Sequence, residues 1–202
     1  MGRILSGCLT IILCIGHPGA QTALCAQAQN ANPSPYVPLA KDGPMYSATI
    51  NKAVERCGLL PLQQIRLPEG SQEIRIWEGF GDGPLNAYVL HRTKGIWSAV
   101  ALLPMYPNYA NQQYRRILPV PRSGWAAFWS EAQKSGLLTL PDSATLPGEK
   151  RVFDGISYVV EIRDGSKYCT YHYGNPQLQV WPEAKRMVKI AELLHKEFPA
   201  PP

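Results

Sequence analysis

The chain contains 202 residues, of which 45% are hydrophobic and 17% charged, and its formal net charge is +5 at pH 7. This apolar share is that of a folded protein and excludes an intrinsically disordered chain. The positive excess is small and spread along the sequence, whereas nucleic-acid-binding proteins concentrate basic residues in a dense patch, so we expect no nucleic-acid partner.

The first 28 residues match the pattern of an export signal peptide. Arg3 gives the positively charged start, residues 4–15 are mostly apolar, and Ala26-Gln27-Ala28 is a small-x-small cleavage site. The apolar run is too short for a membrane-spanning helix, which needs about 18 to 20 apolar residues. We therefore expect cleavage after Ala28, no membrane span, and an exported protein that is periplasmic or secreted.

Cleavage decides which cysteines the mature protein keeps, because three of the five lie within the signal. The last of these, Cys25, is not expected to carry a lipid anchor, since Leu24 stands where a lipoprotein signal has a small residue. The mature chain keeps Cys57 and Cys169, one possible disulfide in an oxidising compartment. Without Arg3 it has 19 Lys and Arg against 15 Asp and Glu, a net charge of +4, and its 174 residues (202 less 28) suit one domain.

Residues 29–44 contain four prolines among small and polar residues and are expected to form a linker or arm. Residues 45–202 then form the single domain. Its first element is expected to be a helix over residues 46–57, with Gly58 at its C-terminal end. The apolar positions of this helix recur at helical spacing: Ile50, Ala53, Val54 and Cys57.

Three strands are expected next, over residues 73–77, 85–92 and 95–103. The third is apolar on both faces, which is typical of a central strand. The glycine-rich stretch 78–83 resembles a nucleotide loop in composition. It is followed by Pro84 and a strand instead of a helix, however, so we interpret it as a hairpin loop.

The segment that follows differs in composition from the rest of the chain. It holds three tyrosines and three arginines: Tyr106, Tyr109, Tyr114, Arg115, Arg116 and Arg122. Tyr and Arg are enriched at interface hot spots because each combines a large contact area with a polar group. We expect Tyr106–Arg122 to recognise a partner; an ordinary loop that covers the sheet edge is the alternative. A helix over residues 125–134 follows, and its tryptophans are expected in the core.

Residues 154–163 and 166–173 are expected to form a β-hairpin around Asp164-Gly165, a dipeptide typical of two-residue type I′ turns. In that register Arg163 faces Ser166. One face of the hairpin is then apolar and the other largely polar, as a half-buried antiparallel sheet requires.

The same register places Ser157 opposite His172 on the polar face, with Cβ atoms about 5 Å apart. A hydroxyl–imidazole hydrogen bond is possible at that separation, as in a serine hydrolase. A serine nucleophile also needs an orienting acid, and Glu161, the nearest on this face, lies roughly 13 Å along the strand. We therefore expect a solvent-facing polar ladder, with Ser157 and His172 as the only catalytic candidates.

The remaining histidines show no metal-binding spacing, so we expect no metal and no cofactor. The last element is a helix that begins at Pro182 and presents an apolar stripe to the hairpin. The order of strands and helices, without alternating parallel units, predicts the α+β class: one domain with an antiparallel sheet and a packed C-terminal helix. Cys169 on the apolar hairpin face and Cys57 on the apolar stripe of the first helix are expected to form a disulfide.

The C-terminal half carries three strings of landmark residues: Trp125-x-x-x-Trp129 with Gly136-Leu137-Leu138-x-Leu140-Pro141; Asp154-Gly155-x-x-Tyr158-x-Val160-Glu161; and Tyr168-x-x-Tyr171-x-Tyr173-x-Asn175-Pro176. In these strings the chain resembles uncharacterised exported bacterial proteins. The landmarks are strand, turn and helix positions, so the resemblance supports the fold and implies no activity.

The sequence therefore predicts an exported, non-catalytic protein that binds a protein or a cell-envelope component through Tyr106–Arg122. Two alternatives remain open. One is a small exported hydrolase that uses Ser157 and His172. The other is an inhibitor or immunity-type protein with one specific protein partner.

Overall fold

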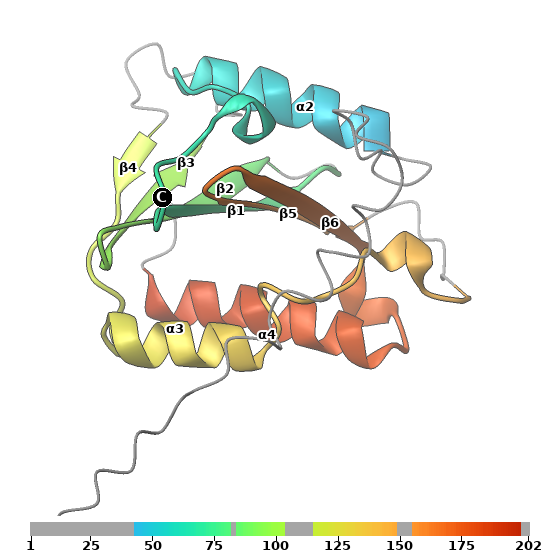
Figure 1. Ribbon diagram of the computed structural model, residues 1–202. Helices are drawn as coiled ribbons and strands as arrows, with labels where there is room; N and C mark the ends of the chain where they lie inside the picture. Colours follow the sequence, from blue (N-terminus) through green and yellow to red (C-terminus); the bar gives the residue numbers. More distant parts are fainter. Residues whose placement is uncertain (1–42, 82–83, 104–114, 149–154, 199–202) are drawn as a thin grey trace, which may run out of the picture.

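A computed structural model describes residues 43–81, 84–103, 115–148 and 155–198. In this part of the chain a six-stranded antiparallel sheet, in the order β4-β3-β2-β1-β5-β6, has helices on both faces (Figure 1). The strands are β1 (Gln72–Gly79), β2 (Asn86–Thr93), β3 (Ile96–Leu102), β4 (Arg115–Ile117), β5 (Ser157–Asp164) and β6 (Lys167–Gly174). The helices are α2 (Gly43–Arg56), α3 (Trp125–Lys134) and α4 (Pro182–Glu197), with short 3-10 turns η1 (Leu62–Gln64), η2 (Ser143–Thr145) and η3 (Pro176–Leu178).

The architecture confirms the predicted α+β class and the packed C-terminal helix. The expected signal peptide, residues 1–28, lies outside the described residues, as does nearly all of the expected linker. Within the described residues, no helix combines the length and the apolar character that crossing a membrane requires.

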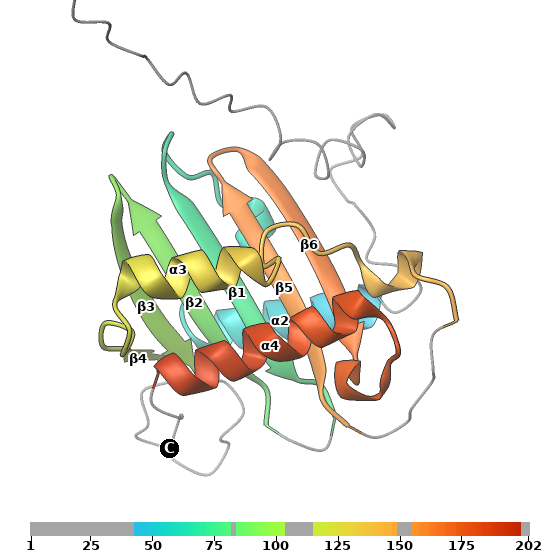
Figure 2. The same cartoon turned by 90° about the horizontal axis from the view of Figure 1, so that it is seen from below.

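Helices α3 and α4 lie side by side on one face of the sheet (Figure 2). Strand side chains alternate between faces, and in the middle of this face they are apolar. The resulting core includes Ile74, Ile76, Tyr88, Leu90, Val160, Ile162, Phe128, Met187, Leu194 and Phe198. The two tryptophans of α3 pack there as predicted: Trp125 and Trp129 lie 5.8 and 4.4 Å, centroid to centroid, from Trp97 of β3.

Helix α2 covers the opposite face (Figure 1). Its apolar stripe packs on a second, smaller core that includes Trp77, Ala87, Leu102 and Val159. The sequence pattern predicted that the polar face of the β5–β6 hairpin would face solvent. That expectation is wrong, because α2 and the chain that follows it cover this face, and Glu161, Arg163 and His172 are buried there.

The β5–β6 hairpin is confirmed, but its register differs by two residues. Asp164 pairs with Lys167, so that Gly165 and Ser166 form the turn. Gly165 has φ +55 at the first central position, where type II′ turns place glycine. Because side chains alternate with a period of two, a shift of two residues changes every opposing pair and leaves both faces intact.

The structure contradicts the expected disulfide. Cys57 belongs to the core under α2, whereas Cys169 packs against the core under α3 and α4. The sheet therefore separates the two thiols, and no disulfide joins them. The error arose because the prediction placed both cysteines on one buried surface, whereas the sheet has a core on each side.

Candidate functional site

The α2 face of the sheet has an apolar half and a polar half. Trp77 of β1 and its neighbours Ala87 and Val159 lie in one row across the sheet, in the core under α2. One step further along β1 and β5, the residues on this face are charged: Arg75 of β1 pairs with Glu161 of β5. The polar half therefore begins directly beside the core.

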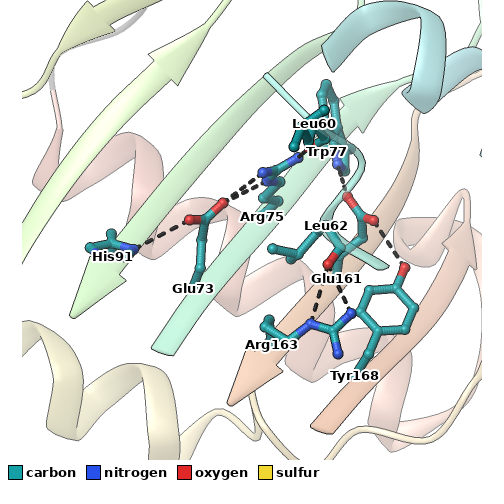
Figure 3. A network of polar contacts seen from close by, with 9 residues as sticks. All are labelled: Leu60, Leu62, Glu73, Arg75, Trp77, His91, Glu161, Arg163 and Tyr168. Carbon is teal, nitrogen blue, oxygen red and sulfur yellow. Dashed lines mark hydrogen bonds and ion pairs between the residues drawn. The ribbon is translucent and has the colours of Figure 1, made fainter. Parts of the chain in front are cut away.

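The charges of this half alternate in sign across neighbouring strands (Figure 3). Glu73 is flanked in register by His91 of β2 and Arg163 of β5. Arg75 Nε and Nη2 each lie 2.8 Å from Glu73 Oε1, and His91 Nδ1 lies 3.3 Å from Glu73 Oε2. Each charge therefore has an opposite charge beside it, which offsets the free-energy cost of removing it from water.

Glu161 is the most deeply buried carboxylate of the network, with 5% of its surface exposed. It accepts hydrogen bonds from Trp77 Nε1 at 2.8 Å and from the Tyr168 hydroxyl at 2.9 Å (Figure 3). Burial raises the pKa of the Glu161 carboxyl, against the opposing effects of the Trp77 hydrogen bond and the Arg75 charge. A neighbouring cavity of about 10 Å³, lined in part by Glu161 and Thr170, has room for one water molecule and for no organic substrate.

The arginines of the network hold the chain that runs over it, residues 59–67, which we call the strap. Arg163 donates to the carbonyl oxygens of Leu62, at 2.9 Å from Nη2, and of Gln63. Arg75 Nη1 donates to the Leu60 carbonyl at 2.9 Å (Figure 3). Because these donors are used internally, the network stabilises the strap and offers little to a substrate.

Ser157 and His172 are not opposite each other, in contrast to the prediction. Ser157 pairs with Gly174, and His172 pairs with Val159. The two side chains are diagonal neighbours across Gly174: the position that a Cβ on Gly174 would take lies 3.8 Å from Ser157 Oγ and 3.7 Å from His172 Nε2. The two-residue shift of register accounts for the change.

Two residues that sequence reasoning missed contact His172. The Tyr46 ring of α2 stacks on the imidazole, with centroids 4.5 Å apart, and Ser143 Oγ of η2 lies 3.4 Å from Nδ1. Asp142 accepts a hydrogen bond from the His172 backbone N–H at 3.1 Å. The sequence carried no signal for these contacts, because η2 and α2 reach His172 only through the tertiary fold.

The glycine-rich stretch 78–83 joins β1 to β2 and opens no helix, in agreement with the hairpin-loop interpretation. Phe80 has φ +69, a backbone conformation that non-glycine residues adopt rarely. Its ring lies 4.8 Å from that of Tyr46. This contact connects the loop to the aromatic stack on His172.

The predicted recognition segment is described in part. Tyr106, Tyr109 and Tyr114 lie outside the described residues. Arg115 and Arg116 are in β4, an edge strand of the sheet, and Arg122 is exposed in the loop before α3.

Strand β4 is exposed at its outer edge. Leu118 N donates to Ala99 O at 2.9 Å, so by antiparallel alternation the backbone N–H and C=O groups of Arg115 and Ile117 point away from β3. The Ile117 side chain is 86% exposed. Among the described residues no strand pairs with this edge, which combines outward-pointing backbone groups with an apolar and a cationic side chain.

A further pair missed by sequence reasoning joins α4 to β1. His195 Nε2 lies 2.8 Å from Glu78 Oε2, and this hydrogen bond raises the pKa of the His195 imidazole. Among the residues that the structure describes, no three His, Cys, Asp or Glu side chains come together as a metal site requires.

No protein-family model matches the chain, and no significant similarity to a curated protein or to a solved structure was found. Functional conclusions therefore depend on the geometry of the site and on the sequence.

Proposed function

We propose that this chain is an exported, non-catalytic interaction protein that binds a protein or an envelope component through Tyr106–Arg122. The observation that carries the proposal is the exposed outer edge of β4, the part of this segment that the structure describes.

An exposed strand edge recognises an extended peptide by adding it to the sheet as a further strand. The outward N–H and C=O groups of Arg115 and Ile117 supply the hydrogen bonds of such an addition. Ile117 supplies an apolar contact, and Arg115 favours an acidic residue in the partner. We expect a partner that presents an extended, acidic segment.

The test is recovery of partners from the cell envelope of the source organism with mature protein as bait, read by mass spectrometry. The bait is compared with Ile117→Asp and with the matched control Val180→Asp, whose wild-type side chain is 82% exposed in a distant loop. We expect Ile117→Asp to lose the partner and the control to retain it. Equal recovery by all three proteins would contradict the proposal.

Export is tested separately by the intact mass of protein purified from its own cells. We expect a chain that begins at Gln29. A mass that includes residues 1–28 would contradict export by a cleaved signal. A single partner that co-purifies in stoichiometric amount would identify the inhibitor or immunity-type form of the proposal.

A hydrolase is the second candidate, favoured by the environment of His172. The Ser143 hydroxyl lies 3.4 Å from Nδ1, and both Nε2 and Ser157 Oγ lie within 4 Å of the position that a Cβ on Gly174 would take. In this reading Ser157 is the nucleophile, His172 accepts its proton, and Ser143 takes the place of the orienting acid.

A fluorophosphonate probe discriminates the two functions, because it labels activated serine nucleophiles covalently. Mass spectrometry of the labelled protein should find an adduct on Ser157 if the protein is a hydrolase, and Ser157→Ala and His172→Ala should abolish it. Absence of an adduct under conditions that label a known serine hydrolase favours the interaction protein.

A further inference from the structure

The solvent face of α4 carries four cations between residues 185 and 196: Lys185, Arg186, Lys189 and Lys196. All four are exposed, and none takes part in the ion pairs of the described residues. Lys185, Lys189 and Lys196 recur at intervals of four and seven, so they share one side of the helix. Glu192 is the one exposed acid among them.

These cations are not needed for packing. The buried stripe of α4 lies on the opposite side of the helix: Ala184, Met187, Ile190, Ala191 and Leu194. Burial of this stripe is sufficient to hold the helix on the sheet, so the stability of the core does not require charged residues on the outer side.

The neighbouring helix makes the surface broader without changing its charge. Helices α3 and α4 lie side by side as the outer layer of this side of the molecule (Figures 1 and 2). The exposed residues of α3 are small or polar, and its two charges, Glu131 and Lys134, form an ion pair at 3.8 Å. The two-helix layer is therefore a broad surface with a net positive charge contributed by α4.

We propose that the α3–α4 layer binds the surface of a membrane rich in anionic phospholipids. Three of the four cations of α4 are lysines, which act as point charges toward phosphate and do not form the bidentate contacts of arginine. The exposed side chains of the layer include no Tyr, Phe or Trp on which nucleic-acid bases stack, and no large apolar residue that inserts into lipid. The binding is peripheral and electrostatic, and it is independent of the β4 edge.

The expected loss of vesicle affinity in a variant follows from the number of charges that are changed. Each Lys or Arg close to an anionic leaflet strengthens binding by about fivefold, and the attraction falls off within a Debye length. Reversal of Lys185 and Lys189 removes two attractive charges and adds two repulsive ones. We expect at least about 25-fold weaker binding from the double variant.

The experiment is co-sedimentation of the full chain with vesicles of phosphatidylcholine, with and without phosphatidylglycerol. Wild type should bind only the vesicles that contain phosphatidylglycerol, and should dissociate as salt rises above about 0.15 M. Lys185→Glu/Lys189→Glu should lose this binding. The control Lys52→Glu/Lys167→Glu makes the same change in net charge at exposed positions outside the layer and should retain it.

Equal loss of binding by the two double variants would overturn the proposal, since net charge alone would then explain the attraction. Equal binding to both kinds of vesicle would overturn it as well. Duplex DNA is tested in parallel: a variant that loses DNA binding and keeps vesicle binding would assign the layer to nucleic acid instead. Circular dichroism establishes that both variants remain folded, which the exposure of all four substituted side chains leads us to expect.

Discussion

The two faces of the sheet are stabilised in different ways. Under α3 and α4 the core is apolar, and its strength comes from the area removed from water, which does not depend on exact partners. Under α2 the apolar core is smaller, and a network of alternating charges lies beside it beneath the strap. There each buried charge depends on specific partners. The stability of this face should therefore change with pH and with the removal of a single polar side chain, whereas that of the first face should not.

The largest effect is expected in the apolar core. Phe128 of α3 is 1% exposed and packs on Phe198 with ring centroids 5.4 Å apart. Phe128→Ala should lower the free energy of unfolding by about 3–5 kcal/mol, because it removes buried area and leaves a cavity. Urea denaturation at two pH values measures the loss, which should be nearly equal at both. The exposed control Val180→Ala should change stability by less than about 0.5 kcal/mol.

A smaller and more local effect is expected at the strap. Arg163→Met keeps much of the side-chain volume but removes the donors to Leu62 and Gln63. Stability should fall by about 2–3 kcal/mol, because buried carbonyl groups lose charge-assisted hydrogen bonds. Hydrogen exchange should accelerate mainly in residues 59–67. Arg66→Met, at an exposed position of the strap, is the control, and uniform acceleration across the sheet would contradict a local role.

The pH dependence of the polar face should come from Glu161. Its pKa is raised in the folded protein by burial, so the folded state holds this proton more tightly than the unfolded state. The contribution of this proton to the stability of the fold is therefore fully present below the pKa that Glu161 has in the unfolded chain. It is lost as pH rises through the raised pKa of Glu161 in the folded protein. Stability measured across this range should fall in wild type and change less in Glu161→Gln. A parallel pH dependence of the two proteins would show that another group titrates.

The smallest effect is expected from the half-exposed pair between His195 and Glu78. The raised pKa of His195 means that the pair stabilises the fold below the unfolded pKa and that this contribution disappears as pH rises through the folded pKa. Because solvent screens it, the contribution should be less than about 1 kcal/mol. Glu78→Gln should lower the melting temperature slightly at acidic pH and leave it unchanged at alkaline pH. Equal shifts at both pH values would indicate lost packing instead.

Part of the polar network could have been predicted from the sequence. Glu73 and Arg75 alternate along one strand, as do Glu161 and Arg163 along another, so each pair shares one face. Two neighbouring strands that each carry charges of opposite sign at alternate positions are a signal for a buried ion network. We instead interpreted the polar face of the hairpin as solvated, because no local pattern indicates what covers a strand.

The arrangement of the candidate catalytic residues was also only partly predictable from the sequence. Ser157 and His172 were correctly placed on one face, since a two-residue shift of register preserves the face. Their predicted opposition was wrong, because the turn uses Gly165-Ser166 instead of Asp164-Gly165. Ser143, which contacts the imidazole, is 29 positions away in the chain and has no local feature that marks it.

By itself the sequence determined helices α2, α3 and α4, the β5–β6 hairpin, every described strand except β4, and which residues of a predicted strand share a face. These features follow from hydrophobic periodicity and turn chemistry, which act over a few neighbouring residues. Only the tertiary structure decided that α2 covers one face while α3 and α4 cover the other, and with it the separation of Cys57 from Cys169 and the burial of Glu161. An apolar stripe indicates that one side of a helix must be buried, but it does not indicate which face of the sheet buries it. That face depends on how the whole chain packs.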